Sequence, residues 1–216
     1  MVSTLEYIIN KYHLSIGRQY AVEIPNMDRD QLATLFTKLG FDLGAEIGVE
    51  RGLYSETLLK ANPSLYLYSI DPWVASAYAP GIHGIETAQA GYDARYEETK
   101  ARLSPYRCEI MRQGSLTAAR YFPDESLDFV YIDGNHDFVN VAQDLHTWSK
   151  KIRSGGIIAG HDYAFFPLRK HNHVKYVLQT YTKAYGIVPY FIVGANAVGV
   201  PGIKRDPIRS WFWIKS

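Results

Sequence analysis

The sequence predicts an α/β fold: a doubly wound, mostly parallel sheet of seven strands that finishes with an antiparallel hairpin. Three observations predict it. After residue 41, strand-like runs alternate with helix-like runs. The strand-like runs are nearly continuous apolar stretches, which is typical of a parallel sheet covered by helices on both faces. The last two strand-like runs, 190–193 and 210–214, have no helical pattern between them, so we expect them to be antiparallel.

The remaining elements follow in a regular order along the chain. The other strands are expected at 42–49, 65–71, 108–113, 127–133 and 156–161. The helices between and after them are expected at 54–61, 92–103, 138–152 and 174–185. Upstream, residues 28–39 place four large apolar side chains on one face, carry acidic residues in the first turn and stop at Gly40. We therefore expect a helix there that packs on the sheet.

A chain of 216 residues with 47% hydrophobic composition can bury one sizeable core. We expect residues 1–216 to form a single domain, in which residues 1–40 are an N-terminal helical extension. Residues 74–91 form a long insertion rich in Ala, Gly, Tyr and Pro. A loop of that length in a compact domain is typical of a lid, so we expect it to cover the acceptor side of a ligand site.

Composition narrows the classes of partner. The net charge is +1, from 23 basic and 22 acidic residues, and no basic run is long enough to follow a phosphate backbone, so no nucleic-acid partner is expected. The single cysteine, Cys108, cannot make an internal disulfide, and the first residues lack the pattern of a signal peptide. No apolar run is long enough to span a membrane. We expect a cytoplasmic protein with no membrane partner; a homo-oligomer is compatible with these observations.

The stretch from Glu46 to Ser55 is the most informative of the chain. It leads a buried strand into a glycine turn and then a helix, and Asp71 closes the next strand, where a carboxylate can accept two ribose hydroxyls. The turn reads Glu-x-Gly-x-x-x-Gly rather than Gly-x-Gly-x-x-Gly. An acidic residue there repels a pyrophosphate and attracts an ammonium. S-adenosylmethionine carries adenosine, a sulfonium and an amino-acid tail, so the turn fits it better than NAD.

Polar residues also follow the other strands, at the edge where an open α/β sheet binds its ligand. Gly114 and Ser115 follow the third strand, where an adenine edge would lie, although Ser115 could instead cap a helix. Together these positions give the residues expected to bind the cofactor: Glu46, Gly48, Gly52, Ser55, Asp71, Trp73, Gly114, Ser115 and Asp133.

A second group of polar residues follows the fourth and fifth strands. Asp133 and Asp162 end neighbouring strands about 5 Å apart, so their carboxylates can converge on one divalent cation. His136 and His161 stand beside them. A cation that binds a hydroxyl stabilises its ionised form, and a histidine can take the proton. Alternatively, Asp133 caps the following turn and His161 points into the core.

From about residue 41 to the C-terminus, the chain resembles the class I S-adenosylmethionine-dependent methyltransferases, whose sheet is Rossmann-like. The glycine turn is similar to their first motif, and Ile70-Asp71-Pro72-Trp73 is similar to their second. Three further segments resemble the subgroup of macrolide-sugar O-methyltransferases and the more distant catechol type: Tyr131 to His136, Asp144 to Trp148, and Gly155 to Tyr163.

The resemblance implies a methyl transfer to a hydroxyl of a small molecule or sugar, with a divalent cation, Mg or Mn, as a second cofactor. It implies Asp133, His161 and Asp162 as metal ligands and His136 as the catalytic base. Relatives usually present an acidic or amide pair after the fifth strand, so His161 departs from the pattern. A histidine ligand favours manganese, iron or zinc over magnesium, or indicates that no metal binds.

Two other functions remain as alternatives. The segment from Gly134 to Asp137 also matches the Gly-Asn-His-Asp element of two-metal phosphoesterases. Those enzymes also need Asp-x-His on an early strand and Gly-Asp-x-x-Asp on another, and the expected strands of this chain carry neither. The second alternative is a protein that binds S-adenosylmethionine without catalysis. A dehydrogenase is disfavoured by both the glycine turn and the C-terminal hairpin.

Overall fold

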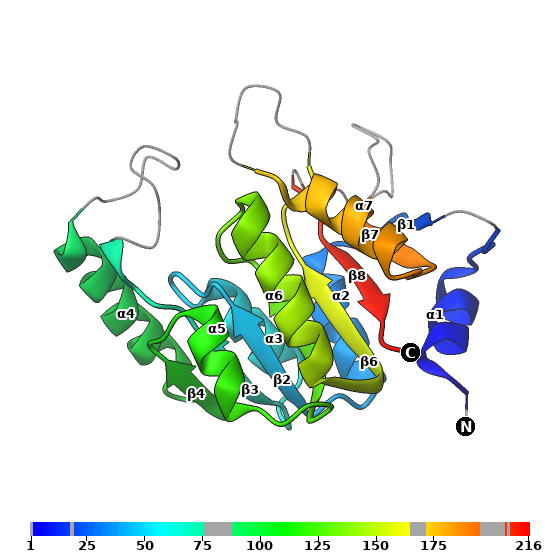
Figure 1. Cartoon of the computed structure of the whole chain (residues 1–216). Helices are drawn as coiled ribbons and strands as arrows, with labels where there is room; N and C mark the ends of the chain where they lie inside the picture. Colours follow the sequence, from blue (N-terminus) through cyan, green and yellow to red (C-terminus); the bar gives the residue numbers. More distant parts are fainter. Residues whose placement is uncertain (1, 18–19, 76–87, 165–171, 195–205, 207) are drawn as a thin grey trace.

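The computed structural model describes residues 2–17, 20–75, 88–164, 172–194, 206 and 208–216. One sheet of eight strands runs through it, with helices on both faces (Figure 1). The strands are β1 (Ala21–Ile24), β2 (Leu43–Ile47), β3 (Tyr66–Ile70), β4 (Cys108–Met111), β5 (Leu127–Ile132), β6 (Ile152–Gly160), β7 (Tyr190–Val193) and β8 (Trp211–Ile214). The α-helices are α1 (Thr4–Tyr12), α2 (Arg29–Lys38), α3 (Leu53–Ala61), α4 (Gln89–Leu103), α5 (Ser115–Ala118), α6 (Phe138–Lys151) and α7 (Val174–Ala184), and a 3-10 turn, η2 (Ala119–Tyr121), follows α5.

The strand order is β1-β7-β8-β6-β5-β2-β3-β4. Strands β2 to β6 pair in parallel with one another, and β8 is antiparallel to both β6 and β7. The chain proceeds outward from β2 to β4 and then returns to place β5 on the other side of β2, which makes the β2/β5 boundary a topological switch point. The doubly wound fold and the antiparallel C-terminal pair are thus confirmed.

The prediction of seven strands was wrong, because the N-terminal segment contributes an eighth. Strand β1 pairs in parallel with β7, with Ala21 opposite Tyr190 and Ile24 opposite Val193. It lies within the segment expected to be a helical extension, between α1 and α2. Its residues alternate between buried and more exposed positions, as in a strand with one buried face. Because there are only four of them, the alternation is too short to be a strong signal in the sequence.

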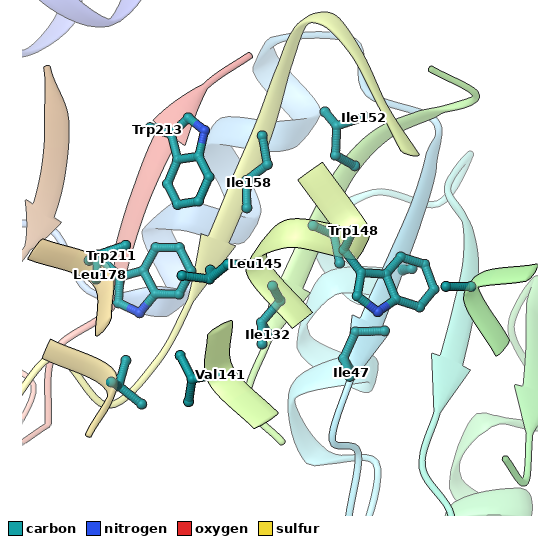
Figure 2. Packing of buried hydrophobic residues seen from close by; sticks show 14 of the residues in the cluster. Ile47, Ile132, Val141, Leu145, Trp148, Ile152, Ile158, Leu178, Trp211 and Trp213 are labelled. Carbon is teal, nitrogen blue, oxygen red and sulfur yellow. The ribbon is translucent and has the colours of Figure 1, made fainter. Parts of the chain in front are cut away.

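Two apolar layers cover the sheet. One contains Val141, Leu145 and Trp148 of α6 together with residues of α7, packed on β2, β5, β6 and β8 (Figure 2). The other contains residues of α1 to α4, as expected for the helix at 28–39, in which Phe36 stacks on Phe129 with ring centroids 4.2 Å apart. The layers lie on opposite faces of the strands because alternate strand residues point to opposite sides.

Most element boundaries agree with expectation to within one or two residues. Helix α4 begins at Gln89 rather than at residue 92, and β6 begins at Ile152, where the preceding helix was expected to end. Residues 76–87 of the expected lid lie outside the described residues. Among the helices in the described part of the chain, none combines the length and apolar character needed to cross a bilayer.

Candidate active site

The switch point brings the glycine turn against the end of β5. The amide of Gly48 donates to the carbonyl of Ile70 at 2.9 Å, and the amide of Asp133 donates to the carbonyl of Ile47 at 2.7 Å. Gly48 has a φ of +89°, and a Cβ there would lie 2.2 Å from the carbonyl oxygen of Asp133. Only glycine fits this position, because both the left-handed backbone and the close approach exclude a side chain.

A cavity of about 370 Å³ opens above this junction. Five of the residues expected to bind the cofactor line it: Glu46, Gly48, Asp71, Trp73 and Asp133. The expected base, His136, also lines it. Other lining residues were not among those expected to bind the cofactor, and they include Arg29, Tyr54, Tyr92 and Arg95.

Glu46 is the acidic group deepest in the site, with 2% of its surface exposed. Its carboxyl accepts a short hydrogen bond from the hydroxyl of Ser55, which in turn lies 2.8 Å from the hydroxyl of Ser69. Burial raises the pKa of Glu46 to about 8, against the opposing effects of the Ser55 hydrogen bond and of the guanidinium of Arg29. Ser55 therefore supports Glu46 from behind and does not line the cavity.

Asp71 holds the glycine turn. One carboxylate oxygen accepts hydrogen bonds from the amides of Val49 and Glu50, each at 3.0 Å, and the other accepts the amide of Trp73 at 2.8 Å. A carboxylate has about four lone-pair sites, so a hydroxyl of a ligand can still be accepted. The expected contact with ribose remains a prediction.

Trp73 forms the wall next to Asp71. It has a left-handed backbone with φ 43°, and its indole N–H donates to the carbonyl of Glu50 at 2.7 Å. The ring packs on Tyr96, with centroids 5.0 Å apart, and belongs to a small apolar cluster with Val49 and Tyr92. A non-glycine residue in this conformation is strained, and such strain is often found at ligand sites.

The structure does not bring three other expected cofactor residues to the cavity. A Cβ at Gly52 would meet Thr99 of α4 at 3.1 Å, so this glycine serves the packing of α4 rather than the approach of a ligand. Gly114 is the N-cap of α5, and its Cβ would meet nothing within 4 Å. Ser115 is the first residue of α5 rather than its cap, and its hydroxyl donates to Asp144 at 2.5 Å and accepts from the indole of Trp148 at 2.8 Å.

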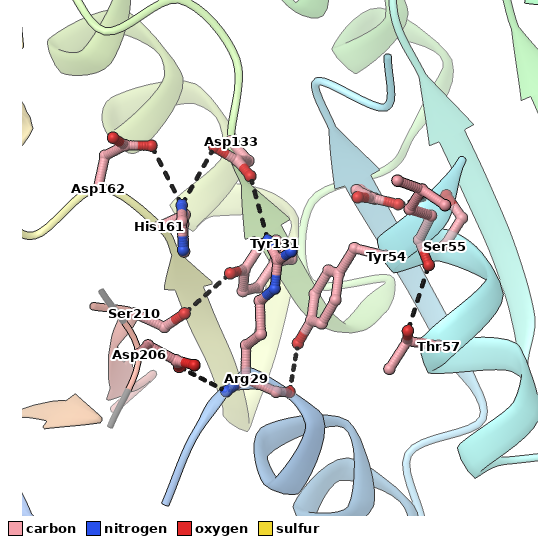
Figure 3. A network of polar contacts seen from close by, with 12 residues as sticks. Arg29, Tyr54, Ser55, Thr57, Tyr131, Asp133, His161, Asp162, Asp206 and Ser210 are labelled. Carbon is pink, nitrogen blue, oxygen red and sulfur yellow. Dashed lines mark hydrogen bonds and ion pairs between the residues drawn. The ribbon is translucent and has the colours of Figure 1, made fainter. Parts of the chain in front are cut away.

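The four polar residues expected after the fourth and fifth strands do converge. Figure 3 shows three of them, Asp133, His161 and Asp162. The Nε2 atom of His136 lies 3.6 Å from Asp133 and 3.2 Å from Asp162. The Nδ1 atom of His161 lies 3.8 Å from Asp133 and 3.2 Å from Asp162. This His/Asp cluster arises because β5 and β6 are adjacent and parallel and therefore end at the same edge.

The electrostatics of the cluster balance two acids against two histidines. Burial raises the pKa of Asp133, an effect only partly offset by its hydrogen bond with His136. Burial also raises the pKa of Asp162, but contacts with both histidines outweigh it and bring the pKa below its usual value. For His136 and His161 burial lowers the pKa, and the neighbouring carboxylates more than reverse that effect. Positive charge is thus favoured among these carboxylates.

Neighbouring groups fix the cluster in place. Asp162 has a left-handed backbone with φ 61° and accepts a hydrogen bond from the side-chain amide of Asn172 at 3.0 Å. The carbonyl of His161 accepts the indole N–H of Trp211 at 2.8 Å, and the carbonyl of His136 accepts the amide of His173 at 2.8 Å. Three members of the cluster are thus tied to β8 or to the segment just before α7, which helps to keep their arrangement defined.

The donor set fits a divalent cation. Asp133, His136 and Asp162 each offer a ligand atom, and these atoms all lie within 4.8 Å of one another. Two carboxylates and an imidazole suit manganese, iron or zinc better than magnesium, which prefers oxygen. His161 Nδ1 lies at comparable distances from the two carboxylates, so either histidine can complete the set.

Comparisons with known proteins identify the family. The sequence matches the family described as a methyltransferase domain over residues 45–163. No curated protein sequence matches it. The fold is similar to an O-methyltransferase from Streptomyces achromogenes, TomG, solved with SAM and involved in tomaymycin synthesis, at 17% identity and TM-score 0.59, covering 96% of this chain and 86% of that one.

Two further solved structures have the same fold. One is an O-methyltransferase from Bacillus cereus solved with S-adenosylhomocysteine, at 13% identity and TM-score 0.58, covering 98% of this chain and 90% of that one. The other is a candidate rRNA methylase from Clostridium thermocellum, at 13% identity and TM-score 0.58, covering 88% and 98%. At these identities the similarity shows the fold, while the sequence match shows the family. This chain belongs to the methyltransferase domain family.

Proposed function

We propose that the protein transfers the methyl group of S-adenosylmethionine to a hydroxyl of a small molecule or sugar. The observation that carries the proposal is the meeting of two sites in one cavity, which is lined by the glycine turn through Glu46 and Gly48 and by the His/Asp cluster through Asp133 and His136. The O-methyltransferases with the same fold support a hydroxyl acceptor. Membership of the family disfavours the phosphoesterase alternative.

The cofactor supplies an activated methyl group on its sulfonium. The chain's own contribution is to hold that group and the acceptor oxygen in line at near-attack distance. Glu46 lies at the cavity with a carboxyl that can pair with an ammonium, and Asp71 fixes the turn against which the nucleoside would rest. The ammonium contact of Glu46 and the ribose contact of Asp71 belong to this proposal.

The acceptor hydroxyl must lose a proton, and we assign that step to His136. This histidine lines the cavity, whereas His161 is not among the residues that line it. His161, Asp133 and Asp162 would then hold the divalent cation. A cation bound there would stabilise negative charge on the acceptor oxygen. For His136 to act as a base it must be neutral, which a bound cation favours by offsetting the carboxylates that otherwise raise its pKa.

Turnover with labelled S-adenosylmethionine tests this assignment, using a panel of sugars, catechols and hydroxylated natural products as acceptors. His136→Ala should retain metal and cofactor but lose about 10²- to 10⁴-fold in rate, the usual contribution of a general base. Asp162→Asn should lose both metal and turnover. His146→Ala is the matched control, because His146 lies on α6 beside Tyr185 and outside the cavity.

Several results would overturn parts of this assignment. Full turnover in His136→Ala would remove that residue as the base. If His136→Ala loses metal while His161→Ala keeps it, the two histidines exchange roles. Methylation that persists in Asp162→Asn and in the presence of a strong chelator would exclude the metal from the reaction. Failure of every acceptor, in a protein that binds the cofactor, would favour the non-catalytic alternative.

A further inference from the structure

Arg29 is held at the cavity by contacts along its backbone. It is the first residue of α2, after an Asp28 N-cap that forms a capping box with Gln31. Its amide donates to the carboxylate of Asp206 at 3.1 Å, and its carbonyl accepts the hydroxyl of Tyr54 at 2.9 Å. The side chain then extends from α2 towards Asp133, between the rings of Tyr54 and Tyr131 (Figure 3). These contacts fix the backbone from which the side chain of Arg29 reaches the cavity.

The guanidinium forms a hydrogen bond with Tyr131 and retains further N–H donors that can bind a ligand. Its nearest approach to Asp133 is 4.0 Å, which is too long for a hydrogen bond. The guanidinium carbon of Arg29, Cζ, lies 5.2 Å from the centre of the Tyr54 ring, and the Arg29 side chain is 38% exposed. A guanidinium carries five N–H donors in a planar fork that matches the two oxygens of a carboxylate.

The acidic lining of the cavity means that a ligand with a carboxylate needs a nearby cation in order to bind. Among the described residues that line it, Glu46, Glu50, Asp71 and Asp133 are acidic. Those that are ionised attract a sulfonium or an ammonium, but they repel the carboxylate of an amino acid. A zwitterionic amino-acid tail can bind here only if a cation lies close to its carboxylate.

Two other arginines line the cavity, and both have close acidic partners. Arg51 is 3.1 Å from Glu98, and Arg95 is 3.3 Å from Glu50 and lies over the ring of Tyr92. Both pairs belong to the side of the cavity formed by α4 and the glycine turn. Arg29 instead lies on the side of Asp133, and its charge acts on Glu46. Arg29 and Glu46 line the same cavity, and Arg29 is therefore the arginine available to the carboxylate of a tail whose ammonium Glu46 receives.

We propose that Arg29 binds the carboxylate of the methionine part of S-adenosylmethionine, while Glu46 takes its ammonium. The proposal rests on the proposed function and names the residue that distinguishes the complete cofactor from an adenosine thioether without the carboxylate. Arg29 would then be a binding residue supplied by the N-terminal segment, outside the part of the chain that matches the family.

Isothermal titration with two ligands tests the proposal. One is S-adenosylhomocysteine, and the other is its analogue with a 3-aminopropyl tail, which keeps the amine and lacks only the carboxylate. Arg29→Gln should weaken the binding of S-adenosylhomocysteine by about 10- to 100-fold. It should change the affinity for the analogue by less than about twofold. Arg29→Lys keeps the charge but not the planar fork. Its affinity for S-adenosylhomocysteine should lie between those of the wild type and Arg29→Gln.

Arg95→Gln is the matched control, since it removes another arginine that lines the cavity. It should change the affinities for the two ligands by the same factor. The proposal is overturned if Arg29→Gln weakens both ligands equally, if it weakens neither, or if the carboxylate-selective loss occurs in Arg95→Gln. Circular dichroism on the titrated samples shows whether the variants are folded. If the wild type binds neither ligand, the proposed function itself fails, which separates the two outcomes.

Discussion

Some residues that line the cavity also stabilise the local fold, and the sequence motif alone does not show which residues do both. Asp71 and Gly48 line the cavity, yet each also holds the strand ends together, Asp71 through three backbone amides and Gly48 through its close approach to Asp133. Gly52, in contrast, is not among the residues that line the cavity, and a Cβ there would meet Thr99 of α4 at 3.1 Å. A motif gives the residue type, but the direction in which a missing Cβ would point depends on elements far away in the chain.

Gly48→Ala should lower the free energy of unfolding by more than about 3 kcal/mol, because the new Cβ meets a backbone oxygen and the left-handed φ becomes strained. Urea unfolding measures it. Gly114→Ala is the control, since a Cβ there meets nothing within 4 Å, and it should stay within about 0.5 kcal/mol of the wild type. Equal stability of the two variants would contradict the close approach.

Glu46 predicts a distinctive pH dependence of stability. Its pKa of about 8 in the folded protein lies above the ordinary 4.5, so the folded state keeps a proton that the unfolded state releases. The contribution of Glu46 to the free energy of unfolding is therefore fully present below about pH 4.5. It declines by about 1.4 kcal/mol per pH unit as the pH rises to about 8. Glu46→Gln should lack this decline, and the difference between the two stability curves isolates it. Parallel curves would show that Glu46 ionises normally.

Asp71→Ala should disturb both stability and cofactor binding. Three amides lose their acceptor, and hydrogen bonds to a charged group contribute about 1.5–3 kcal/mol each, partly offset because burial raises the pKa of Asp71. We expect a loss of about 2–4 kcal/mol in urea unfolding and weaker binding of S-adenosylhomocysteine. Asp124→Ala, which removes a surface carboxylate paired with Lys151, should change neither. An Asp71→Ala protein of wild-type stability would refute this account of the turn.

At the scale of elements, the sequence was most informative where strands are buried on both faces. Continuous apolar runs identified β2 to β8, and their order predicted that Asp133 and Asp162 would meet. It was least informative before residue 41. Strand β1 has only four residues and depends on pairing with β7, and Arg29 resembles a solvated charge at a helix start. Both features become evident only from contacts between distant parts of the chain.

Strand β8 should be an essential element, because it lies between β6 and β7. Phe212 is fully buried there and stacks on Phe191 with centroids 4.8 Å apart. Phe212→Ala should lower the free energy of unfolding by about 3–5 kcal/mol. Tyr185→Ala removes an aromatic ring that is 59% exposed, and it should cost far less. Similar losses in the two variants, measured by urea unfolding, would mean that β8 is not packed as described.

At the scale of the whole molecule, the fold explains why one cavity can serve two chemistries. The β2/β5 switch point brings the glycine turn beside the end of β5, and the adjacency of β5 and β6 brings the His/Asp cluster to the same edge. The N-terminal segment then adds Arg29 from α2. The residues proposed to bind the cofactor and to act on the acceptor thus lie at one edge of the sheet.

The central claim is that the cavity binds S-adenosylmethionine, and titration calorimetry with S-adenosylhomocysteine tests it most directly. The account predicts binding of one ligand per chain, and no heat of binding from NADH under the same conditions. It also predicts that S-adenosylhomocysteine raises the temperature of thermal unfolding, because a ligand that binds only the folded state stabilises it. Binding of NADH with no response to S-adenosylhomocysteine at millimolar concentration would contradict the claim.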